Sequence, residues 1–367
     1  MAGSIYGKLF RVSTWGESHG AGVGVVIDGC PAGLELSEAD IQQYLNRRKP
    51  GQSRYATPRK ETDTVEILSG IFEGRTTGTP ISMLVRNETQ RSSDYSEIAG
   101  YYRPGHADFT FDGKYGFRDY RGGGRSSGRE TIARVAAGAI AAKLLRTLGV
   151  ELLTYTKSIG PIAIDYDRFD RKEILENSLF MPDAAAAEQA AQYIEEMMKA
   201  HDSVGGMAEC IVTGMPVGIG ETVFDKLDAN LARAVVSIGA VKGFEIGDGM
   251  AVAQALGSEN NDGFVMEDGS VRKRSNHAGG TLGGMSDGSS IVIRAAFKPT
   301  PSILHEQETV NKNGEDIQIS IKGRHDPVIV PRAVVVVESM VALTLIDGMM
   351  EHMCARLDWM KEFYRRL

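Results

Sequence analysis

The 367-residue chain contains only three cysteines, Cys30, Cys210 and Cys354. They lie far apart in the sequence, so they cannot all pair, and no two have the spacing of metal ligands. The N-terminus lacks the apolar segment of a secretory signal, and no apolar run approaches the length of a membrane span. We therefore expect a cytoplasmic protein with no membrane contact and no metal site.

Aromatic residues make up 7% of the chain, and no RNA-binding motif is present, although residues 101–120 interleave Tyr, Phe and Arg. The net charge is −7, yet residues 47–60 carry six basic side chains and no acidic one. Local positive loops on a negative protein favour a small, multiply charged anion as the ligand. We rank a nucleic-acid partner well below such a ligand and expect none.

Glycine, in contrast, is abundant, with 43 residues. Residues 121–131 read RGGGRSSGRET and precede a helical pattern over 131–148. Glycines allow backbone N–H groups to approach an anion closely, and the helix directs its positive end at the loop. Ser127 and Glu130 have the spacing of a capping box. The alternative interpretation is a solvated loop that caps an ordinary helix.

Strand patterns occur at residues 9–14, 24–28, 65–72, 81–86, 209–217, 291–297, 317–321 and 328–337. Helical patterns occur at 37–48, 131–148, 183–201, 224–236 and about 338–363. The strands form clusters and do not alternate strictly with helices, which favours an α+β fold. Residues 87–126 show little periodicity, and an unstructured stretch of that length in a compact domain indicates a functional loop.

Residues 16–20 read GESHG and formally match the G-x-S-x-G nucleophile elbow of serine hydrolases. An elbow requires earlier sheet strands and a following helix, and Ser18 comes too early in the chain to have them. His19 is the alternative: an acid or base presented between two strands. A lone histidine in a glycine-rich turn is more often structural, so both interpretations of His19 stay open.

Three further polar clusters stand at expected strand ends or turns: RPGHAD at 103–108, KPTPS at 298–302 and GRHDP at 323–327. In addition, the SNHAGG segment at 275–280 is similar to residues 18–22. This similarity suggests an internal pseudo-repeat, although glycine-rich turns often imitate one another.

Taken in order, these motifs make the chain resemble the chorismate synthase family of the bacterial type, nearly from end to end. The motifs that carry the resemblance are residues 10–20, 47–48 with 53–55, 103–108, 121–131, 275–284 and 324–327. Three positions depart from the usual family pattern. Gly128 replaces a common Ala, Gly239 replaces Asn or Pro, and Pro301 replaces Ser, which weakens the assignment of Gly239 and Pro301 to a flavin site.

The resemblance implies a lyase that converts 5-enolpyruvylshikimate 3-phosphate to chorismate by trans-1,4 elimination of phosphate in the shikimate pathway of aromatic amino acid biosynthesis. It implies reduced FMN, which lends an electron and recovers it without net redox change. The bacterial type and the absence of a G-x-G-x-x-G βαβ unit favour a separate reductase that uses NADPH over an intrinsic flavin reductase.

The resemblance also assigns residues. As catalytic groups it implies His19, which protonates the leaving phosphate, His106 near the flavin, and Asp326, which takes a proton from flavin N5. Arg48, Arg54 and Arg129 would bind the substrate or NADP through planar guanidinium forks. The positions that match FMN contacts are Arg125, Ser126, Ser127, Gly239, Ala240, Gly283, Lys298, Pro299, Thr300, Pro301, Ser302 and Arg324.

For the fold, the resemblance implies one domain over residues 1–367, a β-α-α-β layered sandwich that assembles as a homotetramer. Two alternatives remain. One is a flavin-binding protein of the same fold without the elimination activity, and the other is a serine hydrolase acting through Ser18.

Overall fold

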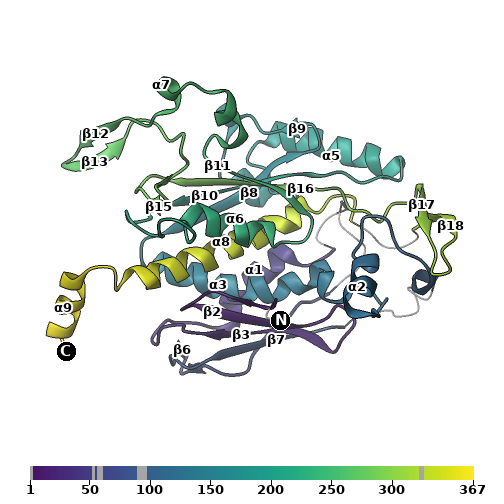
Figure 1. Ribbon diagram of the computed structural model, residues 1–367, viewed down its shortest axis with the longest axis horizontal. Helices are drawn as coiled ribbons and strands as arrows, with labels where there is room; N and C mark the ends of the chain where they lie inside the picture. The colour runs from purple at the N-terminus through teal and green to yellow at the C-terminus, as the bar shows by residue number, and fades with distance from the viewer. Residues whose placement is uncertain (1–2, 52–53, 56–60, 89–96, 322–325) are drawn as a thin grey trace.

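The computed structural model describes residues 3–51, 54–55, 61–88, 97–321 and 326–367 (Figure 1). In this part of the chain, ten strands form two antiparallel five-stranded sheets, ordered β1-β2-β3-β7-β4 and β9-β8-β10-β16-β11. The first sheet contains β1 (Ile5–Tyr6), β2 (Arg11–Gly16), β3 (Gly22–Asp28), β4 (Val65–Ile67) and β7 (Ile81–Arg86). The second contains β8 (Glu151–Ile159), β9 (Ile162–Ala163), β10 (Gly206–Thr213), β11 (Val241–Ile246) and β16 (Ile291–Phe297).

Four short hairpins complete the strands: β5 (Ile71–Phe72) with β6 (Arg75–Thr76), β12 (Phe264–Glu267) with β13 (Ser270–Lys273), β14 (Thr281–Leu282) with β15 (Met285–Ser286), and β17 (Glu306–Val310) with β18 (Asp316–Ser320). The α-helices are α1 (Glu38–Arg48), α2 (Asp108–Tyr115), α3 (Thr131–Thr147), α4 (Glu173–Glu176), α5 (Ala184–Lys199), α6 (Leu227–Val236), α7 (Gly257–Asn260), α8 (Val330–His352) and α9 (Leu357–Arg365).

The layers follow from which helix packs on which sheet. Helix α3 packs on β2 and β3, α8 packs on β8 and β10, and the two helices pack on each other. Helix α1 lies beside α3 and α6 lies beside α8, so two helical layers separate the two sheets (Figure 1). The predicted β-α-α-β sandwich is therefore confirmed.

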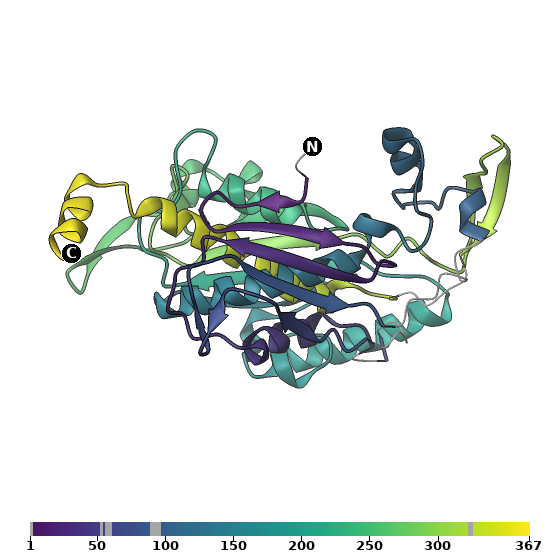
Figure 2. The same ribbon diagram turned by 90° about the horizontal axis from the view of Figure 1, so that it is seen from below.

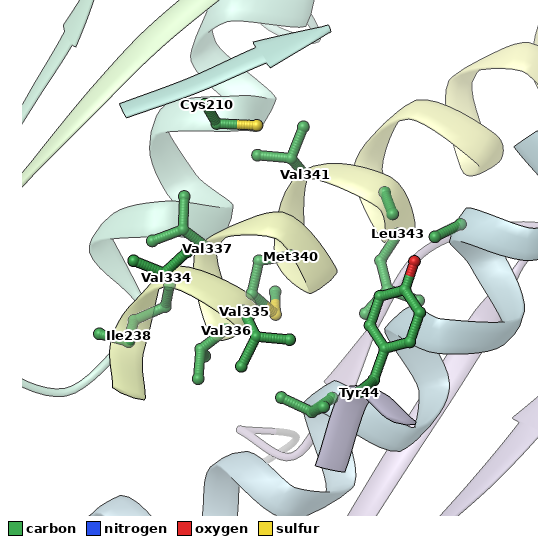
Figure 3. Packing of buried hydrophobic residues seen from close by; sticks show 14 of the residues in the cluster. Tyr44, Cys210, Ile238, Val334, Val335, Val336, Val337, Met340, Val341 and Leu343 are labelled. Atoms are coloured by element: carbon green, nitrogen blue, oxygen red, sulfur yellow. The ribbon is translucent and has the colours of Figure 1, made fainter. Parts of the chain in front are cut away.

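Helix α8 is the centre of the core. Its side chains meet Cys210 on the second sheet and Tyr44 of α1 on the opposite side (Figure 3). In the described part of the chain it is the one helix long and apolar enough to cross a membrane, but 83% of its most apolar 18-residue window is buried inside the protein. A helix that is apolar on all sides is expected where sheets or helices cover every face.

The strand predicted over 328–337 is wrong, because these residues lie mostly in the first turns of α8, which begins at Val330. An apolar run rich in valine does not distinguish a buried strand from a buried helix by periodicity alone. The helix predicted over 338–363 is likewise interrupted, because α8 ends at His352 and α9 begins at Leu357.

Other boundaries differ locally. The strand predicted over 65–72 is divided into β4 and β5 by residues 68–70, which end on Gly70, whose φ of +85° favours glycine. In the stretch 87–126, which showed little periodicity, α2 spans Asp108–Tyr115 and ends on Gly116 in the left-handed conformation. The predicted start of α1 is confirmed: the Asp40 carboxylate accepts hydrogen bonds from the N–H and hydroxyl of Ser37.

The internal repeat is present, but in a different register from the predicted one. GCPAGL at 29–34 follows the central strand β3 of the first sheet, and GMPVGI at 214–219 follows the central strand β10 of the second. Each of the hairpins β5–β6 and β14–β15 precedes the neighbouring strand, β7 or β16. Thr76 and Ser286, one on each hairpin, donate equivalent hydrogen bonds to the carbonyls of Pro31 and Pro216. The two halves thus repeat one strand–helix arrangement.

The sandwich has two different ends. Helices α3 and α8 both begin at the end that carries α2 and the β17–β18 hairpin, whereas α9 and the β12–β13 hairpin project from the other (Figures 1 and 2). The helix N-termini, with their partial positive charge, therefore share one end of the molecule.

Candidate active site

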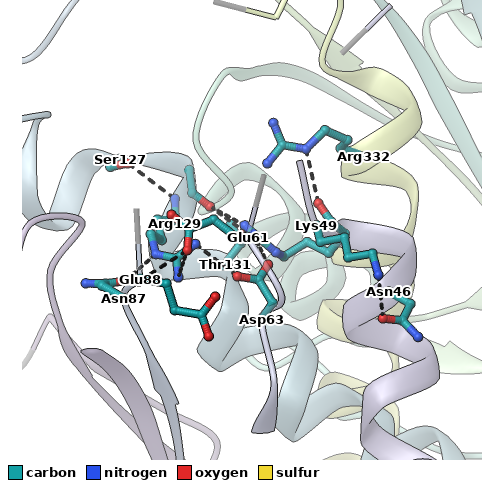
Figure 4. Close-up of polar contacts among 12 residues, drawn as sticks. Asn46, Lys49, Glu61, Asp63, Asn87, Glu88, Ser127, Arg129, Thr131 and Arg332 are labelled. Atoms are coloured by element: carbon teal, nitrogen blue, oxygen red, sulfur yellow. Dashed lines mark hydrogen bonds and ion pairs between the residues drawn. The ribbon is translucent and has the colours of Figure 1, made fainter. Parts of the chain in front are cut away.

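A buried pair of arginines lies where α3 and α8 begin. Arg48, the last residue of α1, donates from Nη2 to Asp63 Oδ2 at 2.6 Å. Arg129, in the turn before α3, donates from Nη1 to Asp63 Oδ1 at 3.0 Å (Figure 4). Two guanidinium groups from different elements thus share one carboxylate.

The charges of this cluster persist at neutral pH. Burial lowers the pKa of Arg48 to about 10, which still leaves the guanidinium protonated. Burial also acts to raise the pKa of Asp63, but Arg48 and Arg129 more than offset it and hold that pKa below its usual value. Glu61 adds a second carboxylate, 3.6 Å from Arg129 Nη2.

Arg48 contacts the first turns of both α3 and α8. Arg48 Nη1 lies 3.4 Å from the hydroxyl of Thr131, the first residue of α3. Arg332, in the first turn of α8, donates from Nε to the carbonyl of Arg48 at 3.1 Å. Helix N-termini favour anions, and here two of them adjoin the same arginine.

His19 lies in the turn between β2 and β3. Its Nδ1 is 3.2 Å from Ser18 Oγ, which also donates to the carbonyl of Gly122 at 3.2 Å. Gly122 packs so closely that a Cβ placed on it would lie 2.1 Å from His19 Cε1. Ser18 is followed by strand β3 and not by a helix, so the nucleophile elbow is absent from this turn.

Asn87 connects the His19 turn to the arginine pair. Its Nδ2 donates to the carbonyls of Glu17 and Gly20 at 2.9 and 2.7 Å, and its Oδ1 accepts a hydrogen bond from Arg129 Nε. One side chain therefore links Arg129 to the residues on both sides of His19.

The glycine-rich loop uses its polar side chains to fix its own shape. Arg125 donates to the carbonyl of Gly16 and to the hydroxyl of Thr14, at 3.0 and 2.7 Å, and so ties the loop to β2. Ser127 Oγ accepts from the N–H of Arg129 as an N-cap, but a short 3₁₀ turn at Gly128–Glu130 precedes α3. The predicted capping residue is correct, whereas Glu130 pairs with Arg134 instead of returning to Ser127.

The turn that carries His106 meets the 298–302 segment. His106 Nε2 lies 2.8 Å from Ser302 Oγ, and Lys298 Nζ donates to the carbonyl of Gly105 at 2.8 Å. Pro301, one of the departures from the family pattern, packs against Gly105, where a Cβ would lie 2.7 Å from the proline Cβ. The backbone N–H of Lys298 donates to the carbonyl of Ala240, which brings residues 239–240 to the same place.

Asp326 joins this segment to the arginine pair. Its Oδ2 accepts from Arg332 Nη1 at 2.5 Å, next to the bond between Arg332 and Arg48. Two residues of one turn complete the connection: Val204 donates to the carbonyl of Pro327, and the hydroxyl of Ser203 donates to the carbonyl of Thr300. Contacts of this kind join most of the predicted site residues to one another.

Two predicted residues stand apart from this network, and a third cannot be placed. Gly283 lies by the N-terminus of α6, where Leu227 donates to the carbonyl of Gly284, whereas Gly239 follows the C-terminus of the same ten-residue helix, about 15 Å away. Arg54 is exposed and pairs with Glu195 of α5 at 2.7 Å. Arg324 lies outside the described residues.

Three members of the cluster were not predicted from the sequence: Glu61, Asp63 and Asn87. Glu61 and Asp63 could have been predicted from the sequence, because they directly follow the basic run 47–60. Asn87 could not have been identified, since its role depends on β7 ending beside the β2–β3 turn.

Unsatisfied donors and a glycine nest fit a bound anion and a phosphate-bearing cofactor. Arg48 Nε and Thr300 Oγ1 are buried with no hydrogen-bond partner in the described part of the chain. Gly122, Gly123 and Gly124, which we call the glycine nest, all have positive φ, between +51° and +83°, and their lack of side chains allows an anion to approach the backbone N–H groups closely.

A separate cavity of about 250 Å³ lies elsewhere, near the C-terminal end of α8. Tyr6, Arg233, Asp347 and His352 are among its lining residues, and no predicted site residue is. The buried cations and the helix N-termini meet at the arginine cluster, which Asn87 joins to the His19 turn, and not at this cavity.

The layered α+β sandwich and the buried arginines at two helix starts are those of an enzyme that acts on a small anionic molecule. The sequence profile of the family described as chorismate synthase matches residues 10–350. Relatives from Agathobacter rectalis and Lachnospira eligens, both named chorismate synthase, are each 67% identical over 100% of both chains. A solved crystal structure of a chorismate synthase has a TM-score of 0.76 and 31% identity, and the match covers 98% of each chain.

The chain therefore belongs to the chorismate synthase family. Its activity is that of a lyase, which eliminates phosphate from 5-enolpyruvylshikimate 3-phosphate to give chorismate for aromatic amino acid biosynthesis. The family implies a flavin cofactor and a small-molecule substrate.

Proposed function

We propose that the elimination takes place at the end of the sandwich where α3 and α8 begin, with Arg48 and Arg129 as the principal anion-binding residues. The observation that carries this proposal is the joining of both arginines to the His19 turn through Asp63 and Asn87. Two guanidinium forks and two helix N-termini suit a substrate with two carboxylates and a phosphate.

Each titratable group then has a role at a defined atom. His19, held through Nδ1 by Ser18, protonates the departing phosphate, a task for a group that titrates near neutrality. His106 supplies a proton near the flavin. Asp326, whose carboxylate is held by Arg332, would accept a proton from the reduced flavin if that cofactor were bound beside it.

Reduced FMN, when bound, supplies an electron as phosphate leaves and recovers it when the ring hydrogen departs. We propose that the glycine loop with Arg125, Ser126 and Ser127, residues 239–240, and the segment 298–302 hold it. The unsatisfied Thr300 hydroxyl and the glycine nest support this placement. Gly283 lies at the opposite end of α6 from Gly239, and its flavin role stays a prediction.

We further propose one domain over residues 1–367, a cytoplasmic homotetramer, and dependence on a separate NADPH-using flavin reductase. The packing of α3 on α8 across the two halves supports the single domain. The exposed apolar side chains of α9, among them Leu357, Phe363 and Tyr364, support contacts between subunits.

The first experiment measures chorismate formation without oxygen, from 5-enolpyruvylshikimate 3-phosphate and FMN reduced by dithionite. Oxidised FMN with NADPH is assayed alongside. Activity with the chemically reduced flavin alone supports the proposal, and activity in both assays indicates an intrinsic reductase. A folded chain that binds FMN but forms no chorismate would be the inactive flavin-binding protein, the alternative favoured by the Gly239 and Pro301 departures.

The residue assignments are tested separately. His19→Ala and His106→Ala are each expected to lower turnover by about 10²–10⁴-fold, the usual contribution of a general acid or base. If both variants bound substrate and kept most of the activity, the roles given to these histidines would be wrong. A Ser18→Ala variant that remained active would rule out the alternative of a serine hydrolase acting through Ser18.

A further inference from the structure

Asp63 is a buried carboxylate with no assigned part in the reaction. Its side chain lies between Arg48 and Arg129, and the residue is 1% exposed (Figure 4). Its φ of +49° is in the left-handed region, which few residues other than glycine adopt, although aspartate does so more readily than most. Conformations of this kind persist only where the surrounding contacts impose them, and they are concentrated at functional sites.

The two oxygens of Asp63 divide the arginines between them. Oδ2 accepts from Arg48 at 2.6 Å and Oδ1 accepts from Arg129 at 3.0 Å. Each bond uses one terminal nitrogen of a planar fork and so restricts the rotation of that guanidinium. Arg48 Nε nevertheless remains buried without a hydrogen-bond partner in the described part of the chain, so not every donor of this guanidinium is satisfied.

We propose that Asp63 is a positioning residue, which sets the orientation and spacing of Arg48 and Arg129 for one anionic group of the substrate and limits the net positive charge that the group meets. The inference rests on the proposed function, in which these two arginines bind the substrate.

Loss of the Asp63 charge should affect turnover and phosphate binding in different ways. Phosphate is a product here and must leave the site, and two adjacent buried guanidiniums without Asp63 would hold a small anion more strongly. Such an excess of charge does not improve catalysis, because only interactions that are stronger in the transition state accelerate the reaction. Loss of Asp63 should therefore reduce turnover while inorganic phosphate binds as well as before, or more tightly.

The test uses the full chain, with Asp63→Asn to remove the charge and Asp63→Glu to keep the charge but displace it by one methylene. Asp183→Asn is the matched control, because Asp183 is equally buried and paired with Arg168 but caps α5 outside the arginine cluster. The measurements are kcat and KM for 5-enolpyruvylshikimate 3-phosphate with reduced FMN, inhibition by inorganic phosphate, and the thermal midpoint.

We expect kcat/KM to fall by about 10- to 100-fold in both Asp63 variants, the scale of a displacement of about 1 Å in a binding group. The phosphate inhibition constant of Asp63→Asn should stay the same or decrease. The double variant Asp63→Asn/Arg129→Lys should lose less than the product of the two single losses, because both changes act on the same group. Asp183→Asn should change the thermal midpoint and leave KM unchanged.

Two results would overturn the inference. One is a kcat/KM within twofold of the unmodified chain in both Asp63 variants; if Asp63→Asn does not fold, Asp63→Glu decides alone. The other is weaker phosphate inhibition together with a lower thermal midpoint, which would mean a structural role only. Arg129→Lys separates the two proposals: if it also leaves KM and kcat/KM unchanged, the proposed function of the arginines fails, and if it alone impairs them, only the role of Asp63 fails.

Discussion

Gly122 is the position where one added methyl group should separate folding from catalysis. A Cβ there would lie 2.1 Å from His19 Cε1 and 2.3 Å from Nδ1, whereas atoms in contact need about 3.5 Å. The imidazole of a Gly122→Ala variant must therefore move by roughly 1 Å or more, and a misplacement of this size costs about 10²-fold in rate, or about 2.7 kcal/mol of transition-state stabilisation.

The same substitution also strains the backbone, because Gly122 has a φ of +69°. Strain alone should cost about 1–2 kcal/mol of folding stability. Gly149→Ala is the matched control: its φ is +79° and no atom lies within 4 Å of the added Cβ. Both variants should lose similar stability in urea, but only Gly122→Ala should lose activity in the assay with chemically reduced FMN. Activity of Gly122→Ala within threefold of the unmodified chain would refute the placement of His19 at the reacting phosphate.

Three further predictions concern stability and reactivity. Gly138→Ala should destabilise the chain by about 1–3 kcal/mol in chemical denaturation, because the added Cβ would lie 2.2 Å from the Cβ of Ser339 where α3 crosses α8. Gly113→Ala is the control in α2, where no atom lies within 4 Å of the added Cβ, and it should be neutral or stabilising. Burial acts to raise the pKa of Asp183, but hydrogen bonds from an arginine and from backbone N–H groups outweigh it and lower that pKa to about 2. The stability that the Asp183 carboxylate contributes is therefore present above about pH 4 and should disappear as the pH falls to about 2. The difference in urea midpoint between the unmodified chain and Asp183→Asn should vanish at about pH 2 and persist above about pH 5. Only Cys354, which is exposed, should react rapidly with a thiol reagent at pH 8, because burial raises the pKa of the other two cysteines to about 11 and 12; a second fast thiol would contradict their burial.

The sequence predicted those parts of the structure that depend on local pattern. The start of the first helix near residue 37 and the glycine loop before α3 both depend on neighbouring residues, and both are found in the structure. The strand predicted over 328–337 failed because an apolar run contains no information about whether sheets will cover it on both sides. The partners of a buried charge are equally non-local: Asp63 and Arg129 are 66 positions apart, and only the fold brings them together.

The internal repeat gives a physical reason for the proposed site to lie at one end of the sandwich. Because each half contributes a strand–helix unit of the same kind, α3 and α8 begin at the same end, and two partial positive charges meet there before any side chain is added. The two halves then differ in what they place around those helix starts. The first supplies the arginines and His19, and the second supplies Lys298–Ser302 and Asp326. A symmetric framework thus holds an asymmetric set of groups, which is what a substrate with chemically different anionic groups and a separate cofactor requires.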